Sequence, residues 1–428
     1  MAGRNRFLEN SWRDFCQRQQ MGASSYLRLS SIPLDVDGLK FFEQRLQLTK
    51  ERPTSVCFDH CYFYRVEPQE AEERLEMLRR IFALFLENGL HHLRLWGPLS
   101  GVLLEAFVSC RQGIALGIQP RFPQKTMKTF QLHDIAFHGE EKGILLKQLF
   151  SQHNEIENLE LQRCYLDTES VAPFAEGLSS FSTLKSLHIW NSYMSDEVLS
   201  VLSKGLMTHK NLERLILRTN SLSSKSLPNL SSILLAFQKL ETLDLAYNCD
   251  LFNLESVAQS FVRRFLQEIQ DHSVLSRLHL RVCGMGPEMA KAFFLMLEQG
   301  SMIRDLDLGG NLHLGEEWAT SLRNIHQLQK LTLPRTIPLE LLGQSTSLLE
   351  LRFDNQSMSY AFPILKRNKL LRQAKQVILH KSNCVHRQQS HQDDIVWPFA
   401  LQILSGQDGE GSSAIFEVVQ SVLVERTS

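Results

Sequence analysis

Four stretches of the sequence begin 28 residues apart: IENLELQRCYL (156–166), LKSLHIWNSYM (184–194), LERLILRTNSL (212–222) and LETLDLAYNCD (240–250). They align without gaps, with apolar residues at places one, four and six and an Asn, Cys or Ser at place nine. The alternation around places four to six is typical of a short strand with one buried face. A fixed period of this length indicates a repeat protein, in which each unit covers its neighbour's apolar surface.

The pattern continues on both sides of these four units. LSRLHLRVCGM (275–285) and IRDLDLGGNLH (303–313) follow it closely, and looser versions begin at positions 53, 90, 127, 328 and 348. A strand-like segment with Leu27 and Leu29 lies one period before position 53. We therefore expect about twelve units. Between the strands, apolar residues recur at helical spacing, as at Val198, Leu199, Leu202 and Leu206.

The units follow L-x-x-L-x-L-x-x-(N/C)-x-L, the signature of leucine-rich repeats. The chain resembles this family, and its long unit with a full helix is similar to the ribonuclease-inhibitor-like (RNI-like) and Ran GTPase-activating classes. The resemblance implies an α/β solenoid (horseshoe) with parallel strands on the concave face and helices on the convex face. The longer steps from 53 to 90 and from 240 to 275 predict lengthened helices, and residues 111–118 could add a strand.

We expect three parts along the chain: a cap helix at 1–20, the repeat array at 21–365, and a basic segment, polar linker and terminal helices at 366–428. The cap is predicted because the end of a solenoid exposes core surface unless it is covered. Its apolar helical face comprises Leu8, Trp12, Phe15 and Cys16. The last part resembles the closing region of leucine-rich-repeat families expanded in unicellular algae, on the strength of Trp397-Pro398 at a helix start.

Eight cysteines at irregular spacing do not form a disulfide framework. Cys57 and Cys61 could be metal ligands, but a zinc site needs four ligands and no second close pair follows. Instead, Cys61, Cys164 and Cys283 stand at place nine, where the chain turns out of a strand. We therefore predict a structural role for these three, without metal.

Composition and motifs limit the possible functions. The net charge is -1, so no general attraction to nucleic acid or an anionic membrane is expected. No apolar run approaches the roughly 20 residues of a membrane-spanning helix, and the first residues lack a secretory signal. A phosphate loop, a dinucleotide motif and HExxH are also missing. We predict a cytoplasmic protein, with the nucleus left open, and neither catalysis, cofactor nor small-molecule substrate.

The candidate binding residues occupy the variable strand places, which face the concave side. Trp190, Arg218 and Tyr247 come from three consecutive units, and Trp, Tyr and Arg dominate binding hot spots. Four further candidates flank them: Arg163, His188, His279 and Arg281. Trp96 is a separate candidate on an earlier unit. The alternative is that Trp190 only packs on neighbouring arginine stems, with no partner.

The sequence thus favours a non-enzymatic module that binds a protein partner on its concave face. One alternative is a regulator of a small GTPase, implied by the resemblance to the Ran GTPase-activating class. That class ends in an acidic tail, whereas these residues end in SVLVERTS. Another alternative is a recognition or adaptor subunit. The sequence does not identify the partner.

Overall fold

The computed structural model describes Trp12, Phe15 and residues 25–49, 53–63, 70–87, 89–114, 127–253, 259–334, 345, 347–354, 365, 366, 368, 369 and 372. The chain divides into two compact units, Met1–Glu268 and Ile269–Ser428. Residues 373–428, which include most of the predicted terminal segment, lie outside the described residues.

Parallel strands form the sheet of the first unit, and each pairs with the strand of the next repeat. Leucines at equivalent places are register partners, as Leu187 and Leu215 are on β8 and β9. In order, the strands are β1 (Tyr26–Ser30), β2 (Ser55–Asp59), β3 (His92–Trp96), β4 (Thr129–His133), β6 (Asn158–Gln162), β8 (Ser186–Trp190), β9 (Arg214–Ile216) and β10 (Thr242–Asp244). Two short strands, β5 (Ala136–Phe137) and β7 (Tyr165–Leu166), pair separately where the chain leaves β4 and β6.

The second unit repeats this arrangement. Its strands are β11 (Arg277–His279), β12 (Asp305–Asp307), β13 (Lys330–Leu333) and β14 (Glu350–Phe353), all parallel. Together the two units supply twelve repeat strands among the described residues, one for each unit that the leucine pattern predicts. The predicted α/β leucine-rich-repeat fold with parallel strands is confirmed.

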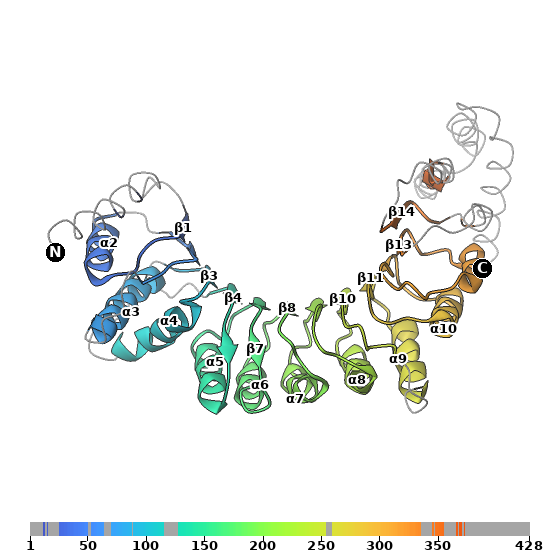
Figure 1. The fold of residues 1–428 in the computed structure, drawn as a ribbon, viewed down its shortest axis with the longest axis horizontal. Coiled ribbons are helices and arrows are strands. Elements are labelled where there is room, and N and C mark those ends of the chain that lie inside the picture. Colours follow the sequence, from blue (N-terminus) through green and yellow to red (C-terminus); the bar gives the residue numbers. More distant parts are fainter. Residues whose placement is uncertain are drawn as a thin grey trace, which may run out of the picture. The chain divides into compact units, whose positions relative to one another are not determined.

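Helices connect successive strands and lie along one side of the sheet in each unit (Figure 1). They are α2 (Val36–Leu48), α3 (Ala71–Glu87), α4 (Ser100–Ile114), α5 (Glu140–Gln152), α6 (Val171–Ser179), α7 (Asp196–Leu206), α8 (Leu227–Ala236), α9 (Gln259–Asp271) and α10 (Pro287–Glu298). The 3-10 helices η2 (Ser224–Ser226) and η4 (Glu317–Asn324) complete the connections. Neighbouring helices approach so closely that a Cβ at Gly205 would lie 2.3 Å from the carbonyl oxygen of Ala175.

A lengthened helix is found in one of the two longer repeats. The step from 53 to 90 contains α3, whose 17 residues exceed the 9 residues of α6, as predicted. The step from 240 to 275 contains α9, whose 13 residues equal those of α5 in a repeat of ordinary length, so the lengthened helix predicted there is wrong for the described residues. The suggestion of a strand at 111–118 is wrong for residues 111–114, which form the last turn of α4. Residues 115–118 lie outside the described part.

Place nine carries a buried side chain that ties neighbouring turns together. Asn248 is fully buried, and its carbonyl oxygen accepts a hydrogen bond from the Leu222 backbone N–H at 3.2 Å. Its amide nitrogen donates to the backbone oxygens of Leu217 at 3.1 Å and Leu245 at 2.7 Å. Asn311 makes the equivalent bonds in the second unit, with Cys283 and Leu280 among its partners. These bonds satisfy backbone groups that the turn removes from water.

Cysteine and serine occupy the same place with fewer bonds. Cys61 and Cys164 are buried, and each thiol donates to a backbone oxygen of the preceding unit at 3.3 Å, Leu29 and Leu132 respectively. Burial raises the pKa of both thiols to about 12, so they stay protonated. Ser192, which departs from the signature, accepts from the Cys164 backbone N–H at 3.1 Å. The structural role predicted for these cysteines matches this geometry.

Two residues of the predicted N-terminal cap are described, and both pack on the first repeat. Trp12 is fully buried, lies 5.0 Å from the Phe42 ring between centroids, and donates to the Pro33 oxygen at 3.0 Å. Phe15 packs edge-on against Trp12 at 6.0 Å. Gly38 makes room for the indole, since a Cβ there would overlap Trp12 Nε1 at 2.0 Å. Leu8 and Cys16 lie outside the described residues.

The place-nine bonds can be tested at Asn248. Asn248→Ala leaves three backbone groups without their partner, and an unsatisfied buried group costs about 1–3 kcal/mol. We expect the free energy of unfolding to fall by at least about 2 kcal/mol in denaturant titrations. The matched control is Asn211→Ala, because Asn211 is exposed and its side chain, among the described residues, accepts only from Lys239. Equal losses in both variants would contradict a special role for place nine.

Candidate functional site

The face of the first unit's sheet that the helices leave uncovered is called here the open face. It carries the side chains at places five and seven of each strand, because the leucines at places four and six point into the core. The place-five side chains from β3 to β8 are Arg94, Gln131, Glu160 and His188. The place-seven side chains from β3 to β9 are Trp96, His133, Gln162, Trp190 and Arg218. The side chains of one place form a column that crosses the strands. The place-five and place-seven columns lie next to each other, so polar and aromatic groups are neighbours.

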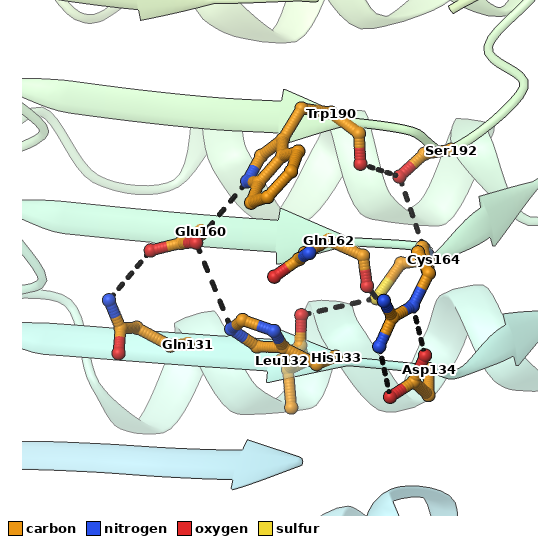
Figure 2. Close-up of polar contacts among 10 residues, drawn as sticks. Gln131, Leu132, His133, Asp134, Glu160, Gln162, Cys164, Trp190 and Ser192 are labelled. Carbon is orange, nitrogen blue, oxygen red and sulfur yellow. Dashed lines mark hydrogen bonds and ion pairs between the residues drawn. The ribbon is translucent and has the colours of Figure 1, made fainter. Parts of the chain in front are cut away.

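Glu160 on β6 is the centre of a polar network that joins three strands (Figure 2). Its carboxylate accepts from Gln131 Nε2 at 2.6 Å and from the indole N–H of Trp190 at 3.2 Å. His133 Nε2 lies 3.8 Å from the same carboxylate. The bond to Glu160 holds the indole of Trp190 in one orientation while the residue stays partly exposed.

His133 is fully buried although it belongs to the open face. Neither ring nitrogen has a hydrogen-bond partner among the described residues. Burial, with Arg94 nearby, lowers the pKa of His133 to about 4, so the ring is neutral near pH 7. The contact with Glu160 is therefore between a neutral imidazole and a carboxylate.

Trp96 lies against two imidazoles and one guanidinium. Its ring centroid is 4.9 Å from that of His60 and 5.6 Å from that of His133. Arg94 places its Cζ 4.7 Å from the centre of the Trp96 ring. The Nε atoms of Arg94 and Trp96 are buried without an acceptor among the described residues. Trp96 thus belongs to a cluster, although the sequence identified it as an isolated candidate.

Arg218 and Tyr247 form a cation–π pair, with Arg218 Cζ 5.5 Å from the ring centre. Tyr247 has a positive φ of 63° at the turn after β10, and 37% of its surface is exposed. The Nε of Arg218 is buried and has no acceptor in the part of the chain that the structure describes. Two of the three predicted central residues therefore meet. Trp190 makes its hydrogen bond in the other direction, to Glu160.

The flanking candidates of the first unit have partners within the protein. Arg163 forms an ion pair with Asp134, including a bond from Nη2 to Oδ2 of 2.9 Å, and this pairing lowers the pKa of Asp134. His188 lies 2.9 Å from the Ser186 hydroxyl through Nε2, and burial lowers its pKa. Both side chains therefore have a partner within the protein, whereas the Arg218 guanidinium has no hydrogen bond or ion pair among the described residues.

His279 and Arg281 belong to the second unit and are described apart from the others. Arg281 is neutralised by two carboxylates, Asp307 at 3.1 Å and Asp354 at 2.6 Å. Gly309 gives it room, because a Cβ there would lie 2.4 Å from an Arg281 nitrogen. Arg281 therefore has a structural role in this unit. His279 is half-buried on β11.

Three residues of this site, Arg94, His133 and Gln131, are not predicted from the sequence. All three stand in the place-five or place-seven columns, so the repeat register contains the signal that could have found them. Selecting them requires the side-chain rotamers that bring Arg94 over Trp96 and Gln131 onto Glu160.

Within the described residues, no group of three or more His, Cys, Asp or Glu side chains could hold a metal ion. None of the described helices has the length and apolar character needed to cross a bilayer. The open face combines ring surfaces, fixed donors and fixed acceptors, which suits binding.

No protein-family model matches the chain, and a comparison with curated proteins finds no match. Among solved structures, the chain is similar to leiomodin-1 actin-binding site 2, with 16% identity over 37% of this chain and 95% of the other and a TM-score of 0.29. It is also similar to TLR13 in a complex with ssRNA13, with 15% identity and a TM-score of 0.39. That match covers 76% of this chain and 46% of TLR13, so the chain spans less than half of the TLR13 length.

The buried histidines predict a pH dependence of stability. His209, also fully buried, has its pKa lowered by burial to about 4, as His133 does. Both histidines titrate near 6.5 when unfolded, so the unfolded chain binds more protons between about pH 6.5 and 4. The contribution of these histidines to the free energy of unfolding is therefore fully present above pH 6.5. It is lost as the pH falls to about 4, by up to about 3 kcal/mol per histidine.

Denaturant titrations from pH 8 to pH 4 test this expectation. His133→Gln and His209→Gln should each reduce the slope of stability against pH in that window. Hydrogen-bonded carboxyl groups change the pH dependence of stability mainly below this window. Burial would raise the pKa of Asp167, but its backbone and side-chain hydrogen bonds outweigh burial and lower this pKa to about 2. An unchanged slope in both variants would show that the histidines do not titrate as expected.

Proposed function

We propose that this protein is a non-enzymatic interaction module that binds a protein partner through the open face of its first unit. The observation that carries the proposal is the pairing of Arg218 with Tyr247 on that face, on the repeats that follow Trp190. Arg, Tyr and Trp contribute most of the energy at protein interfaces because they bury a large area around fixed polar groups.

The open face is prepared for such contacts. Trp190 is already fixed by Glu160, and Arg218 is already oriented by the Tyr247 ring. Ordering a side chain at an interface costs about 0.5–1.5 kcal/mol, and side chains that are fixed beforehand avoid part of this cost. Trp190 ends β8, and Arg218 and Tyr247 lie just beyond the ends of β9 and β10, so a partner meets these residues at set positions.

The finer assignments are proposals of the same kind. The RNI-like class fits the full helices α5, α6, α7 and α8 between consecutive strands. A role as regulator of a small GTPase, or as an adaptor subunit, is compatible with the same binding face, and no contact of that face favours either one.

The test is a comparison of matched variants once affinity purification has identified a partner. We expect Trp190→Ala and Arg218→Ala each to weaken binding of that partner by about 1–3 kcal/mol, measured by calorimetry. Their melting curves should stay close to that of the unchanged protein, because neither residue belongs to the leucine core.

The control variants lie on the helix side. Arg45→Ala removes another cation–π pair, in which Arg45 Cζ lies 5.4 Å from the Phe41 ring on α2. Leu235→Ala removes an exposed leucine of α8. Both should bind as the unchanged protein does. Normal binding by Trp190→Ala and Arg218→Ala, with loss in Leu235→Ala, would place the interface on the helices and refute the proposal.

A further inference from the structure

The arginines of the open face differ in whether the protein itself supplies hydrogen-bond acceptors to their guanidinium groups. Arg28 donates to Asp59 from Nε at 2.9 Å, and Arg163 pairs with Asp134. Arg214 donates to the Ser186 hydroxyl at 3.3 Å and to the Asn158 oxygen at 3.5 Å. The guanidinium groups of Arg94 and Arg218 have no hydrogen bond or ion pair within the described residues, and each stacks on an aromatic ring instead.

Stacking on a ring prepares a guanidinium for a carboxylate. The ring fixes the plane of the guanidinium and leaves its edge to form two parallel N–H···O bonds. Only the Nε of Arg94 and of Arg218 is fully shielded, and both side chains are half-buried, so the outer nitrogens stay accessible. A bond between such an arginine and a carboxylate is stronger than one between neutral groups.

The repeat geometry sets the separation of these two arginines. Arg94 is on β3 and Arg218 follows directly from β9, four strand spacings apart along β3, β4, β6, β8 and β9. At about 4.8 Å per spacing the two side chains are roughly 20 Å apart. An extended peptide covers that distance in about six residues.

Between the two arginines the face is not basic. Glu160 lies there with its carboxylate bound by Gln131 and Trp190, and no cation neutralises it within the described residues. A nucleic acid presents phosphates continuously along its backbone, so some would face Glu160. A peptide can place acidic residues at the two ends and an apolar or basic residue opposite Glu160 and Trp190.

We propose that the open face binds an extended acidic segment of its protein partner, with one carboxylate on Arg94 and a second, about six residues away, on Arg218. This inference rests on the proposed function and adds the chemistry of the partner. Trp190, between the two arginines, provides the ring surface for the middle of the segment.

The experiment is a selection of 12-residue peptides from a random phage-displayed library on the immobilised full chain, followed by affinity measurements with synthetic peptides. We expect enrichment of Asp or Glu at two positions five to seven residues apart. Affinity should fall about 10- to 100-fold in Arg94→Gln and in Arg218→Gln, and should decrease with added salt. Arg94→Lys, which keeps the charge without the fork, should fall between Arg94→Gln and the unchanged protein.

Two controls separate this inference from the proposed function. Arg45→Gln should bind the selected peptides normally, and melting curves should show that each variant folds. Peptides without acidic residues whose binding depends on Trp190 but not on Arg94 would overturn the acidic segment and leave the proposed function standing. If the selected peptides bind the Trp190, Arg94 and Arg218 variants as well as the unchanged protein, or if no peptide is selected, the result counts against both the acidic segment and the proposed function. If the protein binds poly(U) RNA more tightly than the peptides, and the Arg94 and Arg218 variants lose that binding, the choice of a peptide as the ligand is overturned.

Discussion

At the strand exits where place nine carries Asn, Cys or Ser, the backbone turns inside the protein, where an N–H or C=O without a partner costs about 1–3 kcal/mol. The side chain at place nine removes this cost. Asn248 serves two successive turns at once, with bonds to Leu217, Leu222 and Leu245. Because one amide satisfies two repeats, the position of each repeat is set by its neighbour. From Cys164 to Asn248 this interaction links one unit to the next, and the part of the open face that carries Glu160, Trp190 and Arg218 depends on it.

Once the register is fixed, the open face follows from the sequence. Leucines at places four and six fill the core, and each repeat contributes the side chains of places five and seven at intervals of about 4.8 Å. Substitutions at places five and seven leave the core intact, because the side chains at these places point away from it. His133 shows where this separation ends. It stands in an open-face column yet is fully buried, and its neutral state depends on its neighbours.

The sequence predicts the strands, the alternation with helices and the placement of Arg218 and Tyr247 on consecutive units. These features depend on spacing, which the leucine pattern records. The pairing of Trp190 with Glu160, and of Arg94 with Trp96, depends on rotamers of long side chains, each of which could turn toward either neighbouring strand. The suggested strand at 111–118 failed for residues 111–114 because an apolar run this short is compatible with a helix end as well as with a strand.

The open face contains groups that lower the stability of the free protein. The Nε atoms of Arg94, Trp96 and Arg218 are shielded from water without acceptors among the described residues. Their neighbours Asp59 and Asp134 are, by contrast, bound by Arg28 and Arg163. Polar groups left unsatisfied in an otherwise consistent fold are typical of functional sites. A partner carboxylate can pair with the outer nitrogens of Arg94 and Arg218, whereas a partner that supplies only apolar surface leaves both guanidinium groups without an acceptor. The chemistry of the face therefore discriminates between partners as well as attracting them.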